Sequence, residues 1–406
     1  MSMTPPQRIY LDYNATTPVA KDVVDALLPY LQTGYGNASS SYALGQDAKR
    51  AVEQARSQVA TMLSASSPSE ILFLSGGTES INYTLKGCAE VEAKASGRNH
   101  IITTCIEHVA VLETCKYLET KGYEVTYLPV DEYGRVSVDA VMAALTPSTF
   151  LISIMLANNE VGTLQPIAEI VQRVKQHVAS HADTLQRVLF HTDASQAIGK
   201  VRVSVEDLGV DFLTIAGHKL YAPKGIGALY MRASAPRPAT LMHGASHEQG
   251  RRAGTENVAF DVALGTACEM ISRHLETFQQ AMQASRAYLL QRLQEKLATT
   301  GVAMRVNGHP VDVLPNTLSV SFQNVSAVRL LKLIESRGVC ASAGSACHSN
   351  DDPTNAKVSY VLSSMGVSRE FALGTLRLSV GRDTTTAELD LASDAIVDSI
   401  KELITQ

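Results

Sequence analysis

Short apolar runs alternate with stretches of helical spacing over the first 232 residues of the chain. Most of these runs are continuous, a pattern typical of strands that are buried on both faces of a sheet. The sequence therefore predicts an α/β fold with a mostly parallel, seven-stranded sheet between helices. A short loop separates the last two runs, so that pair has the option of pairing antiparallel. The runs are ILFLS (71–75), HIITT (100–104), VTYLPV (125–130), FLISIML (150–156), RVLFHT (187–192), FLTIAG (212–217) and GALYMR (227–232).

The pattern changes after the last run. Residues from about Thr255 to Ala298 have helical spacing with little Gly or Pro, which indicates long helices that lead out of the sheet. Beyond about residue 300 the segments TLSVSF and TLRLSV predict strands of a second, smaller α/β unit. A chain of 406 residues is also long for one domain. We predict a large domain at residues 16–265 and a small domain made of residues 1–15 and 266–406.

Composition narrows the class of protein. Hydrophobic residues make up 45% of the chain, which is enough for a large core, and the net charge of -5 with mixed signs gives no basic surface for nucleic acid. No apolar run approaches the length of a membrane span. The start, MSMTPPQRIY, lacks the charged-then-apolar order of a secretory signal. We expect a cytoplasmic protein with neither nucleic acid nor membrane as a partner.

The six cysteines include no C-x-x-C pair, which argues against a metal site or a thioredoxin-type motif. In a cytosolic chain most cysteines are reduced, buried and inert. Cys347 differs because it lies in ASAGSACHSN (341–350), among small residues that bend easily. Cys340, preceded by RGV, has the pattern of a buried strand residue.

One strand, ILFLS, leads into Gly76-Gly77-Thr78 and then into a helical pattern. Glycines permit close approach of a ligand to the backbone, and the first N–H groups of a helix bind anions. The segment is a candidate phosphate cradle, although it lacks the pattern of a nucleotide P-loop. The alternative is a glycine turn with Thr78 as the helix N-cap.

Two further polar residues follow predicted strands. Asp193 stands at the carboxyl end of RVLFHT, the edge of an open α/β sheet where ligands bind. Lys219 follows FLTIAG, and partial burial would make its amine available for a Schiff base. The alternatives are a helix N-cap for Asp193 and a surface position for Lys219. A phosphate cradle, a carboxylate and an amine are together the three handles of pyridoxal 5'-phosphate.

At these residues the chain resembles class V aminotransferase-fold enzymes of the cysteine desulfurase and selenocysteine lyase family. The resemblance runs from about residue 8 to 383 and implies the pyridoxal-phosphate-dependent fold type I. The stretches that carry it include IYLDYNATTP, SGGTES, EHVAV, LANNEVGTLQPI, HTDASQAIGK, GHKLYAPKGIGALY, GRRAGTEN, LPNTLSVSF, GSAC and LRLSVGR.

The resemblance implies a role for each matching position around the cofactor. Lys219 would carry the cofactor as a Schiff base, and Asp193 would pair with its ring nitrogen. Gln196 would donate a hydrogen bond to the ring hydroxyl. His108 would stack on the ring, with a capped core histidine as the alternative. The phosphate would be held by Gly77 with the amide that follows it, Thr78, His218 and, from the other subunit of a homodimer, Thr255.

The substrate side is implied in the same way. Arg377 would bind the substrate carboxylate, with a structural ion pair as the alternative. Asn37 and Asn158 would assist near the cofactor and substrate, with Asn159 as the alternative to Asn158. Cys347 would be the nucleophile that takes sulfur from L-cysteine and carries it as a persulfide, while alanine leaves. Lys219 would remove the α-proton, and a sulfur-acceptor protein is a possible partner.

Some positions depart from the usual desulfurase pattern. Ala38 and Tyr42 stand in a motif that ordinarily reads GNPSS and ends in His, and Ala216 replaces a serine that would reach the phosphate. At Tyr42 and at His348, beside Cys347, the sequence is more similar to that of selenocysteine lyases. Selenocysteine lyase, which releases selenide and alanine, therefore stays open as the alternative activity. Another β-lyase or aminotransferase, and a sulfur-relay scaffold without catalysis, are the more distant alternatives.

Overall fold

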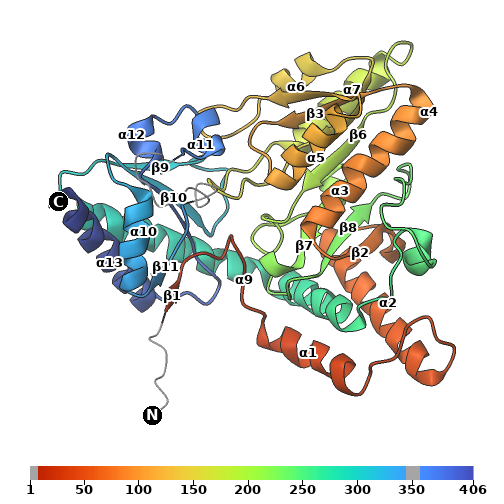
Figure 1. The fold of residues 1–406 in the computed structure, drawn as a ribbon, viewed down its shortest axis with the longest axis horizontal. Helices are drawn as coiled ribbons and strands as arrows, with labels where there is room; N and C mark the ends of the chain where they lie inside the picture. Colours follow the sequence, from red (N-terminus) through yellow and green to blue (C-terminus); the bar gives the residue numbers. More distant parts are fainter. Residues whose placement is uncertain (1–7, 344–356, 406) are drawn as a thin grey trace.

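A computed structural model gives the fold of residues 8–343 and 357–405, drawn in Figure 1. Cys347 and His348 lie outside these described residues. Figure 1 shows one body built around a large sheet, and a second body built around the C-terminal elements, with the long helix α9 running between them. The helices are α1 (Lys21–Gln32), α2 (Ala43–Leu63), α3 (Gly77–Cys88), α4 (Lys94–Ser96), α5 (Val109–Glu119), α6 (Val138–Ala144), α7 (Ile167–Ser180), α8 (Val205–Leu208), α9 (Val258–Leu297), α10 (Ala327–Ser336), α11 (Tyr360–Ser364), α12 (Arg369–Ala372) and α13 (Thr386–Thr405).

The large sheet has seven strands in the order β2-β8-β7-β6-β5-β3-β4. β8 pairs antiparallel with both of its neighbours, and the other pairings are parallel. Each of the seven apolar runs forms a strand, which confirms the predicted mostly parallel sheet and the antiparallel option for the last two runs. The strands are β2 (Ile71–Leu74), β3 (His100–Thr104), β4 (Glu124–Leu128), β5 (Thr149–Ser153), β6 (Leu189–Asp193), β7 (Phe212–Ala216) and β8 (Gly227–Met231).

The C-terminal body contains two small sheets. Strands β9 (Met304–Asn307), β10 (Thr317–Phe322) and β12 (Thr375–Ser379) form an antiparallel sheet in the order β12-β10-β9. β1 (Ile9–Tyr10) pairs in parallel with β11 (Val339–Cys340), so the first strand of the chain belongs with the C-terminal body.

The helical pattern after Thr255 forms one helix of 40 residues, α9, rather than several. Its first half packs in the apolar cluster of the large sheet, through residues such as Leu264 and Ile271. Its second half packs, through Leu289 and Leu293, with Ile9 and Leu11 in a separate cluster of the C-terminal body. A helix without an internal Pro or Gly turn can cross between two cores in this way. The domain boundaries at residues 15 and 265 stay a prediction.

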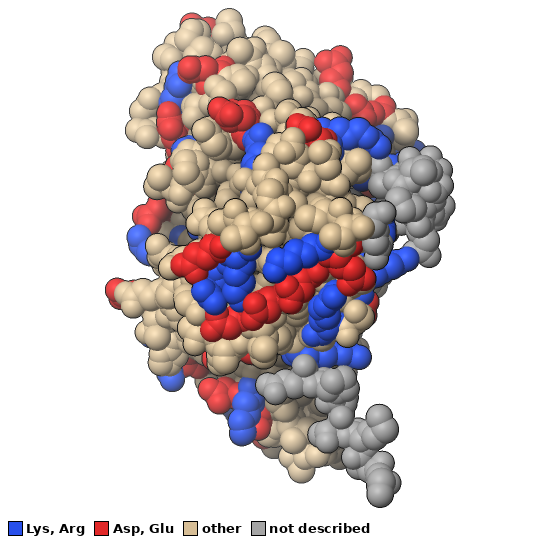
Figure 2. Space-filling model, turned by 90° about the vertical axis from the view of Figure 1, so that its left-hand side faces the viewer, with Lys and Arg blue, Asp and Glu red and all other residues tan. Residues whose placement is uncertain are grey.

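Charges of both signs lie side by side over the C-terminal body, where Figure 2 shows a band of acidic side chains bordered by basic ones. α13 carries acidic residues at four-residue spacing, which places them on one face of the helix. Their partners come from α9, α10 and α13 itself. The ion pairs are Arg292–Asp390, Lys296–Asp394, Arg337–Glu402 and Lys401–Asp398. This face is therefore neutralised locally. No helix in the described part of the chain has the length and apolar character of a membrane span.

One buried ion pair joins α2 to the segment that precedes α9. The Arg56 guanidinium donates to both carboxylate oxygens of Glu248, at 2.7 and 2.8 Å, and Nη1 also donates to the carbonyl oxygen of Ile71 at 3.0 Å. The two side chains are only 4% and 5% exposed. The nearby Asp261 is also buried, and Arg251 Nη2 lies farther away, 3.9 Å from Glu248 Oε2, so removing the Arg56 guanidinium would take away the close cationic partner of Glu248.

We expect Arg56→Met to lower the free energy of unfolding by about 3–5 kcal/mol, because the buried Glu248 carboxylate would lose its two short hydrogen bonds and keep only the 3.9 Å ion pair with Arg251. Arg50→Met is the matched control on the same helix, since Arg50 is 71% exposed and pairs with exposed Asp47. The control should cost less than about 1 kcal/mol. Guanidinium chloride unfolding of both purified variants measures the difference, and equal losses would contradict it.

Candidate active site

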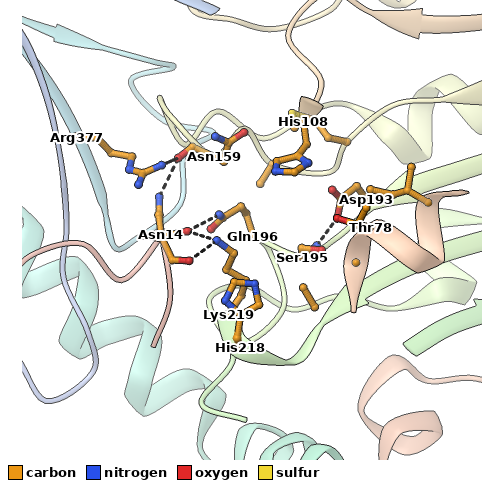
Figure 3. Close-up of a pocket in the computed structure, with 16 residues that line it drawn as sticks. Asn14, Thr78, His108, Asn159, Asp193, Ser195, Gln196, His218, Lys219 and Arg377 are labelled. Atoms are coloured by element: carbon orange, nitrogen blue, oxygen red, sulfur yellow. Dashed lines mark hydrogen bonds between the residues drawn. The ribbon is translucent and has the colours of Figure 1, made fainter. Parts of the chain in front are cut away.

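A cavity of about 220 Å³ lies where the large sheet meets the N-terminal segment and β12. All strands of the sheet except β8 end at the side that faces it, and the segments that follow β2, β3, β5, β6 and β7 supply most of its walls. This is the edge at which open α/β sheets bind ligands. The lining includes eight residues expected from the sequence, namely Gly77, Thr78, His108, Asp193, Gln196, His218, Lys219 and Arg377. Figure 3 shows Arg377 on one side of the cavity and Thr78 with Asp193 on the other.

Lys219 ends the short 3-10 turn η3 (Gly217–Lys219) that follows β7, and its amine lines the cavity rather than the outer surface. Nζ donates to the backbone carbonyl oxygens of Asn14 and, at 2.8 Å, Ala15. Burial, together with the positive charge of Arg377, lowers the pKa of Lys219 from 10.5 to about 8. The carboxylates of Asp12 and Asp193 act in the opposite direction. A substantial fraction of the amine is therefore neutral, and nucleophilic, near physiological pH.

Asp193 is the last residue of β6 and is 8% exposed. Its Oδ1 accepts a hydrogen bond from the backbone N–H of Ser195 at 2.9 Å. Asp193 caps no helix, because α8, the next helix along the chain, begins only at Val205. A buried carboxylate with so few donors is suited to a cationic N–H from a ligand.

The phosphate-cradle segment forms the N-terminus of α3, which begins at Gly77 with Gly76 as N-cap. Thr78 is therefore inside the helix and is not its N-cap, which excludes the alternative reading of this segment. A Cβ atom on Gly77 would lie 3.3 Å from both Ala216 Cβ and Ser195 Oγ. Glycine thus lets the helix start come close to β7 while its first N–H groups face the cavity.

Two histidines line the cavity in neutral form. His108 Nδ1 accepts the backbone N–H of Ala110 at 3.1 Å, which leaves the ring proton on Nε2. Burial lowers the pKa of His108. Burial and the charge of Lys219 lower the pKa of His218 to about 4, and its Nδ1 lies 3.2 Å from the Thr16 hydroxyl. His108 is thus both a helix cap and a cavity residue, and each ring keeps one N–H to donate.

Arg377, on β12, brings a positive charge to the other side of the cavity. Nη2 donates to Asp12 Oδ1 at 2.8 Å, and Nη1 donates to the carbonyl oxygen of Asn159 at 3.0 Å. Arg377 Nε and Asn159 Oδ1 are buried without a hydrogen-bond partner among the described residues. Asp12 holds the guanidinium in place, and these unpaired atoms leave hydrogen-bonding capacity for a ligand.

The cavity position expected of Asn158 belongs to Asn159, which lines the cavity. The Asn158 amide is bonded at both ends, because Nδ2 donates to Ile106 O at 3.1 Å and Oδ1 accepts the N–H groups of Glu160 and Val161. Asn158 therefore shapes the loop that carries Asn159.

Two other expected residues lie outside this cavity. Asn37 is exposed, and its side chain accepts the N–H of Ser39. Thr255 lines a separate cavity with Arg252 and Asn257. The roles of both residues stay predictions.

The sequence did not single out Asn14, Ser195 or Met155, which also line the cavity. Asn14 lies within the stretch IYLDYNATTP, so its family motif was visible. Its place beside Lys219 could not be predicted, because about 200 residues separate the two along the chain. No periodicity within either segment reports such a contact.

These residues fit pyridoxal 5'-phosphate. The glycine-bounded start of α3 suits its phosphate, Asp193 its ring nitrogen, and the amine of Lys219 its aldehyde. No group of His, Cys, Asp and Glu within the described residues has the arrangement of a metal site.

Comparisons with known proteins point the same way. The family profile described as aminotransferase class-V matches residues 9–391. The cysteine desulfurase IscS of Methanosarcina thermophila is 43% identical over 97% of this chain and 92% of its own length. A cysteine desulfurase of Nostoc sp. is 42% identical over 97% of this chain and 93% of its own length.

Two solved structures are similar over nearly the whole chain. A NifS-like protein has a TM-score of 0.88 at 37% identity, over 98% of this chain and 100% of that chain. A structure described as SspA in complex with cysteine has a TM-score of 0.76 at 35% identity, over 93% of this chain and 99% of that one.

We expect the amine of Lys219 in cofactor-free protein to react with an amine-specific acylating reagent with a pH midpoint near 8. The neutral amine is the reactive form, and its share rises as pH passes the lowered pKa. Peptide mass spectrometry after short pulses of reagent measures the midpoint. A midpoint near the ordinary lysine value of about 10.4 would contradict the buried environment.

Proposed function

The chain belongs to the class-V aminotransferase family, and from this membership we propose that it is a pyridoxal 5'-phosphate-dependent cysteine desulfurase. It would remove sulfur from L-cysteine and leave alanine. The observation that carries the proposal is the cavity itself, in which a buried, low-pKa Lys219 lies between Asp193 and Arg377. Relatives named cysteine desulfurases support the reaction, and the structure of SspA in complex with cysteine supports the substrate.

The cofactor would be held at both of its ends. The first N–H groups of α3 at Gly77 and Thr78 would bind the phosphate, with His218 as a neutral donor. Asp193 would accept a hydrogen bond from the protonated ring nitrogen. Bound in this way, pyridoxal phosphate supplies an electron sink for the α-carbon of an amino acid. Asp193 would keep that sink effective by holding the ring nitrogen protonated.

Lys219 would handle the proton at the α-carbon. The unmodified amine of Lys219 has a pKa of about 8, so a useful fraction is neutral near physiological pH and would be able to accept the α-proton. The carbonyl oxygens of Asn14 and Ala15 would orient Nζ at the cavity wall. His108 keeps its Nε2 proton toward the cavity and would be the second group able to pass a proton to the substrate.

Arg377 would orient the substrate by its carboxylate. Its guanidinium is already fixed by Asp12, so little side-chain entropy is lost on binding. The unpaired Oδ1 of Asn159 can only accept a hydrogen bond, so it would bind an N–H group of the ligand rather than the carboxylate.

Cys347 would take the sulfur. Its thiolate attacks the sulfur of the substrate, a sulfur–sulfur bond forms, and the carbon–sulfur bond breaks. The electron pair stays on the β-carbon, which takes a proton to become the methyl group of alanine. The residue lies outside the described part of the chain, so this role rests on the motif GSAC and on the relatives. We further propose a homodimer, completed by Thr255, and a protein acceptor for the persulfide sulfur.

We expect the purified protein with pyridoxal phosphate and a thiol reductant to convert L-cysteine to equal amounts of alanine and sulfide. Lys219→Ala should lose at least a hundredfold in kcat, because the proton acceptor is gone. Cys347→Ala should abolish cysteine turnover. The same variant assayed with selenocysteine tests the alternative activity, since retained turnover there would favour a lyase. Formation of pyruvate or a keto acid in place of alanine would contradict the proposal.

We expect Arg377→Lys to raise KM for L-cysteine about 10- to 100-fold, with a smaller change in kcat. A lysine keeps the charge but loses the planar pair of donors, which corresponds to about 1.5–3 kcal/mol. Steady-state kinetics of alanine formation measure both constants. Arg135→Lys, at a surface ion pair with Asp312, is the control and should leave KM unchanged. An unchanged KM in Arg377→Lys would show that the carboxylate binds elsewhere.

A further inference from the structure

Lys200 is a buried lysine behind the wall of the cavity, four residues after Gln196. It is 4% exposed, and no carboxylate within the described residues lies at ion-pair distance from it. Its Nζ donates to Gln196 Oε1 at 2.7 Å and to Asn14 Oδ1 at 3.2 Å. A lysine buried with two amide oxygens as its partners is costly, so these two contacts need a reason.

The side-chain amide of Gln196 has an oxygen that accepts hydrogen bonds and an NH₂ group of similar size that donates them. Lys200 donates to the oxygen end, and the nitrogen end donates to the backbone carbonyl oxygen of Asn14 at 3.0 Å. Lysine offers donors at this contact, and a carbonyl oxygen only accepts. Both contacts therefore select the same orientation of the amide, with one N–H of Nε2 left for the cavity that Gln196 lines.

Asn14 is fixed in its turn by the C-terminal body. Its Oδ1 also accepts from Asn316 Nδ2 at 3.0 Å, and its Nδ2 donates to Thr317 Oγ1 at 2.8 Å. The carbonyl oxygen that receives the Gln196 amide also receives the amine of Lys219. Figure 3 shows Asn14, Gln196 and Lys219 converging at one side of the cavity.

We propose that Lys200 is a positioning residue which, through Gln196, keeps an N–H donor directed at the ring hydroxyl of the bound cofactor. The proposal rests on the proposed function, because it needs pyridoxal phosphate in this cavity. Without Lys200 the Gln196 amide loses the donor that fixes its oxygen. Only the contact with the Asn14 carbonyl oxygen then holds the amide, so the turned-over orientation, with an oxygen that repels the ring oxygen, becomes more populated.

Burial lowers the pKa of Lys200 well below the ordinary value, and the positive charges of Lys219 and Arg377 act in the same direction. The hold of Lys200 on Gln196 does not depend on this charge, because a neutral amine still has two N–H groups for its two partners. Lys200→Met would leave the buried Gln196 Oε1 without its donor, which costs about 1–3 kcal/mol, so the variant should stay folded with a moderately lower unfolding temperature. The absorbance measurement on folded protein then separates positioning from support of the fold.

The test uses the visible absorbance of the protein loaded with pyridoxal phosphate, titrated with pH. An N–H directed at the ring oxygen favours the proton-poor form of the bound cofactor, so its loss moves the absorbance transition to higher pH. We expect Lys200→Met to raise the midpoint by about one pH unit, the equivalent of one hydrogen bond to a charged acceptor. Lys200→Arg, which keeps donors, should return at least half of the shift.

Two further variants show whether Lys200 acts through Gln196. In a Gln196→Ala background, Lys200→Met should give no additional shift, because the amide that it orients is absent. Lys175→Met is the control, since Lys175 donates to the Gly209 carbonyl oxygen at 2.7 Å and does not line the cavity. If Lys200→Met does not fold, Lys200→Leu, which also has no donor, takes its place with the same expected direction.

If the wild type shows the cofactor band and the midpoint of the Lys200 variant is unchanged, this inference is overturned and the proposed function is left intact. The same shift in both backgrounds would also overturn it, because Lys200 would then act on the cofactor without Gln196. A wild-type protein that shows no cofactor band would overturn both the inference and the proposed function.

Discussion

Burial of the Lys219 amine is the constraint on which the rest of the site depends. An amine taken out of water must find acceptors, and here it finds the backbone carbonyl oxygens of Asn14 and Ala15. Those carbonyls belong to a segment whose preceding strand, β1, pairs with β11 in the C-terminal body. The site therefore exists only when the two bodies are assembled. Cysteine desulfurase chemistry gains from this arrangement because desolvation is also what makes the amine a base near neutral pH.

The large sheet and the C-terminal body supply opposite sides of the cavity. The strand ends of the sheet supply the proposed cofactor side, with Asp193 on β6 and the start of α3 after β2. The C-terminal body supplies the proposed substrate side through Arg377 on β12. The segment from Asp12 to Thr17 joins them, since Asp12 holds Arg377 and the Thr17 N–H donates to the carbonyl oxygen of His218 at 2.9 Å. Two buried polar atoms at this junction, Arg377 Nε and Asn159 Oδ1, have no partner among the described residues, and both residues line the cavity.

The sequence predicted what is local. Continuous apolar runs located the seven strands, and residues at strand ends located Asp193 and Lys219, because both signals lie within a few residues. The family motifs added His108, Gln196 and Arg377, whose roles periodicity alone does not suggest. What the sequence missed is long-range. Asn14 and Lys200 meet across 186 positions of the chain. Asn158 was chosen over Asn159 because neighbouring residues in a loop cannot be told apart until the backbone shows which amide is already bonded.

The central claim is that Lys219, and no other lysine, carries the cofactor. Reduction of the loaded protein with borohydride, followed by peptide mass spectrometry, tests it most directly, because reduction fixes the cofactor to the lysine that holds it. The account predicts a phosphopyridoxyl group on the Lys219 peptide alone. A modified peptide that contains Lys200 or Lys224 instead, or no modified peptide at all, would contradict it.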